Sequence, residues 1–417
     1  MNAETINGIL GIQESYKMPD RLMNILMSED KDAYFDRFME VGEDLKHDWF
    51  NEYYQNEHGD RDKLKQDFTP DSVCEIAMEI IELKEPILDM CSGTGALTIR
   101  AWNKGHNDFY CIEYAERAIP VLIFNLAIRN IKATVFHADA ITREVFNVYI
   151  LNPGEKYSEI IKSEDKSLIR FTCGSCIMNP PYSLKWDGAR LFGEYPTPPK
   201  SKADYCFMLD ALERLESDGE ITAILSHGVL FRGATEGKIR AKLIENRLID
   251  CVIGLPDKLF LNTRIPVCII KLKKNRDESN IFFLDASKEF RKDRAYNILD
   301  PEHIEKIVKT YKERNFVDKY ADIATLEKLK DNEFNLNIPR YVDTFEDNPP
   351  EHSIDELAAE MYKINQDIRE LDTEILKSSQ ELTASAELHE KKLSEFIKCL
   401  KEMIEENEKH KLELENP

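Results

Sequence analysis

Residues 88–97 read LDMCSGTGAL, an apolar run that leads into two closely spaced glycines and then into the helix-like segment 98–101. Gly93 and Gly95 let the backbone approach a bound ligand closely, because they have no Cβ. The carboxylate of Asp89, at the end of the expected strand, is placed to attract an ammonium group. A strand, a glycine-rich loop and a helix in this order predict a ligand-binding loop in an α/β fold.

Short apolar runs alternate with helix-length amphipathic segments from about residue 63 to residue 275. This alternation predicts a doubly wound, Rossmann-like α/β sheet, which binds ligands at the carboxyl ends of its strands. The candidate strands are 87–88, 109–112, 134–136, 177–178, 221–225, 251–253 and 267–270, with a further one at 281–284. Functional side chains are therefore expected in the segments that follow these runs.

The glycine loop favours a ligand without phosphates. A G-x-G-x-x-G fingerprint needs glycine where Thr98 stands, and no Walker lysine follows, so S-adenosylmethionine fits better than a dinucleotide or a triphosphate. Glu113 ends the next run, 18 residues after Gly95, where a carboxylate can accept from both ribose hydroxyls. Asp139, followed by Ala140, is placed to accept from the adenine amino group of the cofactor. Each acid alone is more often a solvated charge, but their order predicts one site.

The tetrapeptide Asn179-Pro180-Pro181-Tyr182 follows the run at 177–178. An asparagine oxygen and the Pro180 carbonyl can accept both hydrogens of an exocyclic amino group, which takes the nitrogen lone pair out of conjugation and lets it attack a methyl donor. The prolines fix φ and have no competing N–H, and Tyr182 offers a planar face for a base. Alone, the tetrapeptide is equally compatible with a Pro-Pro loop that closes a strand.

Composition limits the surroundings of such a site. The 417 residues carry a formal net charge of −22, and DNA repels an acidic surface, so a DNA-acting chain needs a concentrated basic face or a partner that contacts phosphates. No apolar stretch approaches the ~18 residues of a membrane span, and the N-terminus lacks a secretory signal, which predicts a cytoplasmic protein. Nine scattered cysteines, with one C-x-x-C (Cys173 to Cys176), predict reduced thiols and no metal site.

The pattern divides the chain into four regions: a helical region at 1–62, a catalytic domain at 63–275, its extension at 276–350 and a helical arm at 351–417. Ser353 and Glu356 form a capping box that opens the arm. Apolar residues then recur in alternating steps of three and four, which is typical of a coiled-coil seam, and a break is expected near 383–386. The seam consists of Ile354, Leu357, Met361, Ile364, Ile368, Leu371 and Ile375. It predicts an arm that docks on a partner subunit.

At this point the chain resembles the N6-adenine DNA methyltransferases, and among them the modification subunits of type I restriction-modification systems. Besides the glycine loop and N-P-P-Y, the resemblance rests on QDFTP at 66–70, HGVLFRG at 227–233, IGLP at 253–256, NTRIP at 262–266 and NLNIPRY at 335–341. It covers about residues 63 to 345. Two features depart from the family: the N-terminal helical region is short, and 142–171 is expected to be an inserted surface loop.

The resemblance implies a role for each matching residue. Gln66, Phe68, Thr69 and Pro70 would pack against the methionine end of the cofactor, with Thr69 capping a helix that has Pro70 at its first position. Ser92, Gly93 and Thr94 would line the cofactor, Glu113 would hold its ribose and Asp139 its adenine.

The leading hypothesis is that a flipped-out adenine stacks on Tyr182 and is held by Asn179 and the Pro180 carbonyl while its amino nitrogen attacks the methyl group. Phe231 is a possible second stacking surface, although an aromatic residue after an apolar run is expected in the core. Double-stranded DNA, a specificity subunit, a second modification subunit and a restriction subunit are the expected partners. Cytosine N4, a protein glutamine, or a non-catalytic role beside an active sister subunit are the alternatives.

Overall fold

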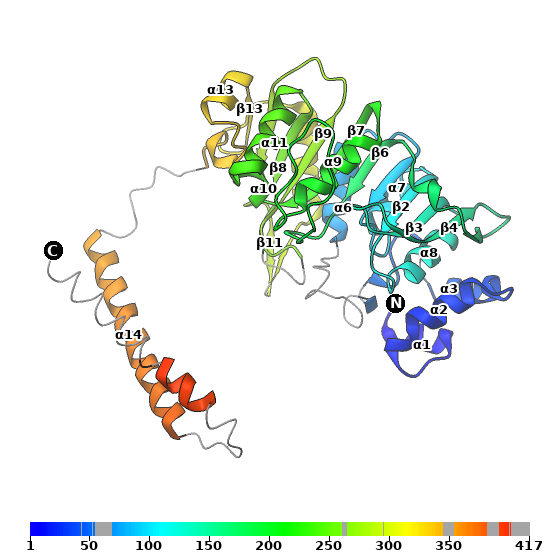
Figure 1. The fold of residues 1–417 in the computed structure, drawn as a ribbon, viewed down its shortest axis with the longest axis horizontal. Coiled ribbons are helices and arrows are strands. Elements are labelled where there is room, and N and C mark those ends of the chain that lie inside the picture. Colours follow the sequence, from blue (N-terminus) through cyan, green and yellow to red (C-terminus); the bar gives the residue numbers. More distant parts are fainter. Residues whose placement is uncertain are drawn as a thin grey trace. The chain divides into compact units, whose positions relative to one another are not determined.

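The glycine loop follows β1 (Ile87–Met90), an interior strand of an eleven-stranded sheet (Figure 1). Ile87 and Leu88 are fully buried and, as neighbours in a strand, point to opposite faces, so both faces of β1 are covered. The computed structural model describes residues 1–42, 44–51, 53–54, 69–260, 265–294, 296–344, 354–381, 392–399 and 401. The chain divides into two compact units, Met1–Thr344 and Phe345–Pro417.

The winding of the sheet reverses at β1. This strand pairs in parallel with β2 (Asp108–Glu113) on one side and with β6 (Cys173–Met178) on the other. β3 (Lys132–Ala138) lies parallel to β2, and β7 (Leu215–Ser226) lies parallel to β6. The complete order is β13-β10-β8-β9-β7-β6-β1-β2-β3-β4-β5. The sheet is therefore doubly wound, and its switch point lies between β1 and β6, where ligands bind in such sheets.

Four more strands extend the sheet beyond β7. β9 (Val267–Lys273) runs antiparallel between β7 and β8 (Ile249–Gly254), β10 (Ile281–Asp285) lies parallel to β8, and β13 (Ala321–Ala324) closes this edge antiparallel to β10. All eight apolar runs that the sequence predicts as strands are strands, so the predicted α/β fold class is confirmed.

The segment 142–171 is not the surface loop that we expected. It contains β4 (Val145–Asn152), which pairs antiparallel with β3, and β5 (Glu159–Ser163), which pairs antiparallel with β4. Val148 and Leu151 are fully buried and belong to the cores on the two faces of the sheet. The expectation of a loop was wrong because β4 has apolar side chains for both faces.

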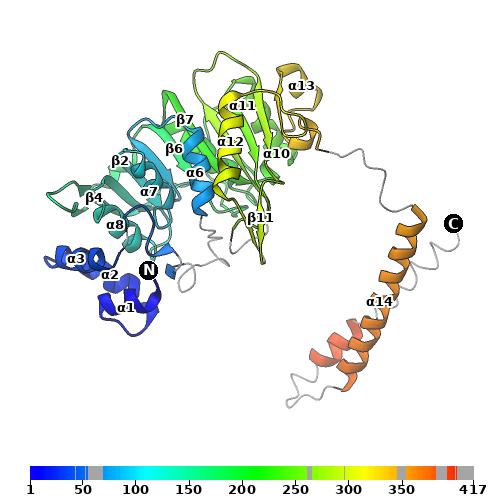
Figure 2. The ribbon, with the colours of Figure 1, turned by 180° about the vertical axis from the view of Figure 1, so that it is seen from behind.

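Helices cover both faces (Figures 1 and 2). One face is packed by α6 (Asp71–Ile80), α7 (Ala96–Asn103), α8 (Ile119–Ala127) and α12 (Pro301–Glu313). The other face is packed by α9 (Asp204–Arg214), α10 (Gly228–Phe231), α11 (Ala234–Glu245) and α13 (Leu326–Asp331). Outside the large sheet, β11 (Arg291–Asp293) and β12 (Tyr296–Ile298) form a small hairpin.

The N-terminal helices pack on α8. They are α1 (Ala3–Leu10), α2 (Met18–Leu26) and α3 (Lys31–Val41). The rings of Phe35 and Phe38 contact that of Phe124 in α8 edge-on, with centroids 5.4 and 4.7 Å apart. This aromatic cluster joins the N-terminal helices to the helix that lies behind the glycine loop.

The second unit contains α14 (Ile354–Glu381). Six apolar side chains of the predicted seam are exposed in it, namely Leu357, Met361, Ile364, Ile368, Leu371 and Ile375. Ser353, the side chains of Ile354 and Glu356, and the expected break at 383–386 lie outside the described residues, so the coiled-coil arm stays a prediction. Within the described parts of both units, no helix has the length and apolar character required to span a membrane.

Candidate active site

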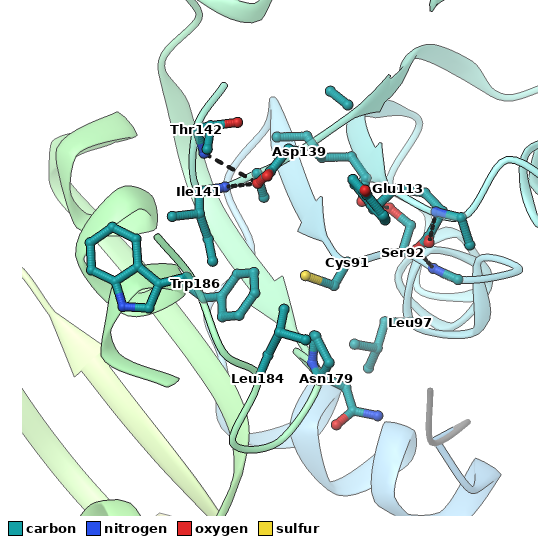
Figure 3. Close-up of a pocket in the computed structure, with 18 of the residues that line it drawn as sticks. Cys91, Ser92, Leu97, Glu113, Asp139, Ile141, Thr142, Asn179, Leu184 and Trp186 are labelled. Atoms are coloured by element: carbon teal, nitrogen blue, oxygen red, sulfur yellow. Dashed lines mark hydrogen bonds between the residues drawn. The ribbon is translucent and has the colours of Figure 1, made fainter. Parts of the chain in front are cut away.

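A pocket of about 400 Å³ opens at the carboxyl ends of β1, β2, β3 and β6 (Figure 3). This volume is in the range of small-molecule sites. In Figure 3, Glu113 and Ser92 lie on one side of Cys91, and Leu184 and Trp186 lie on the opposite side. The predicted site residues that line it are Thr69, Ser92, Gly93, Thr94, Glu113, Asp139, Ala140, Asn179 and Pro181. The lining does not include Pro70, Asp89, Gly95, Pro180 or Tyr182, while Gln66 and Phe68 lie outside the described residues.

The glycine loop turns with the help of its two glycines, which both adopt a left-handed backbone. Gly93 has φ 57° and Gly95 has φ 95°, which residues with a Cβ rarely adopt. The Gly95 amide donates to the Ser92 carbonyl at 2.8 Å, and Gly95 is the N-cap of α7. The Ser92 hydroxyl donates to the Asp89 carbonyl at 2.7 Å. These bonds fix the loop at the pocket wall.

Asp89 is turned into the protein. One carboxylate oxygen accepts from the Thr98 amide at 3.1 Å and from the Thr98 hydroxyl at 2.6 Å. The other oxygen is buried without a hydrogen-bond partner among the described residues. Burial raises the pKa of Asp89 to about 7, against the lowering effect of the Thr98 hydrogen bonds. The side chain therefore anchors α7 to β1, and an ammonium group in the pocket does not meet it in this conformation.

Glu113 and Asp139 hold the turns that follow β2 and β3. Glu113 accepts from the Gly93 amide at 2.8 Å and from the Ala115 amide at 2.6 Å, and burial raises its pKa. Asp139 accepts from the amides of Ile141 and Thr142 at 2.8 and 3.2 Å (Figure 3). Both acids line the pocket while their oxygens order the backbone around it.

Asn179, directly after β6, hydrogen-bonds through both ends of its amide. Its nitrogen donates to the Thr69 hydroxyl at 2.9 Å, and its oxygen accepts from the Tyr182 hydroxyl at 2.7 Å. Thr69 does not cap a helix with Pro70 at its first position: Pro70 itself is the N-cap of α6, and its carbonyl accepts from the amides of Val73 and Cys74. That prediction was wrong, because the Thr69 hydroxyl binds a residue 110 positions away.

The aromatic side chains near the tetrapeptide differ from their expected exposure. The Tyr182 ring is only 6% exposed and meets Phe260 edge-on, with centroids 6.3 Å apart. Phe231, expected in the core, is 48% exposed at the end of α10. It is exposed because its neighbours Val229 and Leu230 fill the core positions of that short helix. In this conformation Phe231 is thus more exposed than Tyr182.

A buried carboxylate that sequence reasoning missed joins two walls of the pocket. Asp210 in α9 is fully buried and accepts from Arg143 at 2.7 Å, Arg190 at 2.5 Å and Arg214 at 2.7 Å. Arg143 follows the turn at Asp139, and Arg190 follows the lining residues Leu184 and Trp186. Arg190 also donates to the Ile141 carbonyl at 2.7 Å. An aspartate within the apolar stretch 205–212 was the available sequence signal.

A second missed network connects the glycine loop to the N-terminal segment. The Asn125 amide in α8 donates to the Thr94 carbonyl and to the Asp48 carboxylate, each at 2.8 Å. Arg129, one turn later, donates to the carbonyls of Leu45 and His47 at 2.7 and 2.6 Å. Burial lowers the pKa of Arg129 to about 10 and raises that of Asp48. The segment is thus held against the back of the loop.

The charges around the pocket favour a cationic ligand. Its described lining contains the carboxylates of Glu113, Asp139 and Asp187 and one cation, Lys185. Phosphate groups would meet net negative charge here, whereas a sulfonium or an ammonium group would be attracted. The charged side chains that line the pocket therefore fit S-adenosylmethionine.

The fold and the pocket at its switch point define the class: this is the α/β sheet of S-adenosylmethionine-dependent methyltransferases. A model of the N-6 DNA methylase family matches residues 46–349, more than half of the chain. The chain belongs to that family, as the resemblance predicted.

Its relatives are methylase subunits of type I restriction enzymes. The MpnII methylase subunit of Mycoplasma pneumoniae is 27% identical over 334 residues, 73% of this chain and 59% of that subunit. The HindI methylase subunit of Haemophilus influenzae is 26% identical over 378 residues, 82% of this chain and 80% of that subunit. The crystal structure of a type I restriction-modification methyltransferase subunit from Streptococcus thermophilus is 30% identical, with a TM-score of 0.60, and covers 76% of this chain and 65% of its own. The chain thus spans about three fifths of the Mycoplasma subunit.

Proposed function

We propose that this chain is the modification subunit of a type I restriction-modification enzyme and transfers a methyl group from S-adenosylmethionine to N6 of adenine in DNA. One observation carries the proposal. Asn179, directly after β6, lines the same pocket as Gly93 in the loop after β1, Glu113 at the end of β2 and Asp139 after β3. An acceptor for an amino group and a cofactor loop thus face one cavity at the switch point of the sheet.

S-adenosylmethionine supplies an electrophilic methyl carbon on a sulfonium. The Gly93 backbone, Glu113 and Asp139 would hold it, with the ribose at Glu113 and the cofactor adenine at Asp139. Glu113 would then exchange its bond to the Gly93 amide for bonds from the ribose. Thr69, Ser92 and Thr94 complete the lining on this side.

The role of Asn179 is to accept hydrogens of the target amine together with the Pro180 carbonyl. The bond from its nitrogen to Thr69 directs the amide so that its oxygen is the acceptor. That oxygen now holds the Tyr182 hydroxyl, which the target amine must displace. The amine loses its proton readily once it is methylated, so the pocket needs no strong base.

The target adenine would stack on Tyr182 after it leaves the duplex. Phe231 is the candidate for a second stacking surface. Asp204, which is buried, accepts from the Ser183 amide at 3.2 Å and from Arg232 at 3.1 Å. It thereby connects the residue after Tyr182 to the residue after Phe231, which supports a shared base site.

A specificity subunit would select the DNA site, because a chain of net charge −22 needs help to approach DNA. The exposed seam of α14 is the candidate docking surface for this subunit or for a second modification subunit. A restriction subunit would join the same complex.

The test is Asn179→Ala. It should abolish transfer of labelled methyl groups to DNA by the assembled complex and leave S-adenosylmethionine affinity within about twofold, because Gly93, Glu113 and Asp139, which would hold the cofactor, are unchanged. Persistent methylation would refute the role of Asn179. Nucleoside analysis separates N6-adenine from N4-cytosine, and a glutamine substrate would leave DNA unlabelled. A chain without S-adenosylmethionine affinity in calorimetry would instead be a structural partner of an active sister subunit.

A further inference from the structure

The β11–β12 hairpin is basic in an acidic chain. Residues 288–294 read KEFRKDR, with four basic and two acidic side chains, whereas the whole chain has a net charge of −22. Arg291 is paired with Asp300 at 2.8 Å. Lys292 and Arg294 are exposed and enter no ion pair among the residues that the structure describes. The hairpin therefore presents uncompensated positive charge at its turn.

The hairpin follows β10 on the side of the sheet where the parallel strands have their carboxyl ends, which is also the side of the candidate active site. β7 and β8 are both antiparallel to β9, so they run parallel to each other, and β6 and β10 run parallel to them. Asp285, which ends β10, therefore lies at the edge where Asn179 follows β6. In Figures 1 and 2, β11 projects beyond this edge of the sheet.

The base of the hairpin is fixed to a segment that packs on the N-P-P-Y tetrapeptide. The Asn297 side chain is buried and donates to the backbone carbonyl and to the carboxylate of Asp257, both at 2.8 Å. The backbone amide of Asn297 donates to the Lys258 carbonyl at 3.1 Å. Phe260, two residues further along, meets the Tyr182 ring. The hairpin is thus held at a fixed position relative to the pocket.

We propose that this hairpin is a DNA-backbone contact, with Lys292 and Arg294 on phosphates beside the target base. The inference rests on the proposed function, because it takes DNA as the substrate of the adjacent pocket. Lysine and arginine on phosphates release condensed counterions, so each contact contributes to the salt dependence of binding. A basic projection at this edge resolves part of the conflict between an acidic chain and an anionic substrate.

The test compares two double variants of the full chain, each in the assembled complex. Lys292→Glu with Arg294→Glu changes the hairpin. Lys309→Glu with Lys330→Glu changes two exposed lysines by the same total charge and serves as the control. Lys309 is on α12 and Lys330 is on α13. The helix α13 follows the end of β13, which pairs with the start of β10. It therefore lies at the opposite end of the strands from the candidate active site. The probe is a fluorescent DNA duplex of arbitrary sequence, titrated at salt concentrations from about 50 to 200 mM.

The slope of log K against log salt is negative, and the hairpin variant should make it shallower by about 1.8. This change corresponds to two lost phosphate contacts at about 0.9 each. The control should keep the slope of the unaltered chain. Equal slopes for both variants would overturn the proposal. If the hairpin variant shows no change while Asn179→Ala abolishes methyl transfer, the hairpin inference alone fails. If the unaltered chain binds no S-adenosylmethionine, the proposed function fails instead.

Discussion

The Tyr182 hydroxyl donates to the Asn179 side-chain oxygen at 2.7 Å, so the acceptor proposed for the target amine is already engaged inside the protein. The same contact explains why the Tyr182 ring is buried against Phe260 and not open to a base. Base entry then requires Tyr182 to move and exchanges one hydrogen bond on Asn179 for another.

Tyr182→Phe should retain methyl transfer, with a KM for DNA that is unchanged or up to about fivefold lower. The lost hydroxyl bond contributes about 1 kcal/mol and no longer competes with the target amine for the Asn179 oxygen. Tyr182→Ala should weaken base capture by about 1–3 kcal/mol, since it removes the stacking ring. Both are measured as KM and kcat for labelled methyl transfer by the assembled complex. Equal loss in the two variants would show that the hydroxyl itself is needed.

Thr69→Val should lower kcat by about 5- to 10-fold, because the Asn179 nitrogen loses its acceptor and the amide loses its fixed orientation, a loss of about 1–1.5 kcal/mol. Thr69→Ser keeps the hydroxyl and should restore the rate. The readout is kcat at saturating DNA beside S-adenosylmethionine affinity in calorimetry. A parallel loss of cofactor affinity in the valine variant would assign Thr69 to cofactor binding instead.

Asp89 should make stability depend on pH. Its pKa of about 7 in the fold is above the ordinary value of 3.8. Its contribution to the free energy of unfolding is therefore fully present below pH 3.8 and is lost as pH rises through about 7. The shift of about three units corresponds to about 4 kcal/mol. Relative to Asp89→Asn, the unaltered chain should therefore lose most of that stability between pH 4 and 7.

Urea unfolding of both proteins across this pH range measures the difference. Asp318→Asn, at an exposed position, is the control and should follow the unaltered chain at every pH. A constant difference between the Asp89→Asn variant and the unaltered chain would mean that folding does not raise the pKa of Asp89.

Much of the sheet could be predicted from the sequence, because its interior strands are buried on both faces and read as continuous apolar runs. β4 escaped prediction because it pairs antiparallel with β3 and β5, outside the alternation of strands and helices that marks the parallel part of the sheet. Phe231 was assigned to the core because nothing local distinguishes it from Val229 and Leu230, which are buried. Exposure of one residue in a short helix depends on the path of the chain around it.

The side chains that line the pocket were largely predictable, since loops after parallel strands gather at one edge. Their hydrogen bonds were not. Thr69 carries a local capping signal, yet its hydroxyl binds Asn179. Asp210 joins arginines 67 and 20 positions before it in the sequence, and no spacing rule connects them. Such long-range polar pairs depend on the packed structure.

Arg190 should control cofactor affinity because it bridges two walls of the pocket. Its guanidinium contacts Asp210, Glu213 and the Ile141 carbonyl, so it joins the segment of Leu184 and Trp186 to the turn of Asp139. Arg190→Met should raise the dissociation constant of S-adenosylmethionine about 5- to 30-fold, through the loss of about 1–2 kcal/mol of charge-assisted hydrogen bonding that orders these walls. Arg143→Met is the matched control, since Arg143 also contacts Asp210 and Glu213 but makes no contact with the Ile141 carbonyl among the described hydrogen bonds. Calorimetry should show the larger effect for Arg190→Met while thermal unfolding shows similar losses for both. Equal cofactor affinities in the two variants would mean that the contact between Arg190 and the Ile141 carbonyl does not order the pocket.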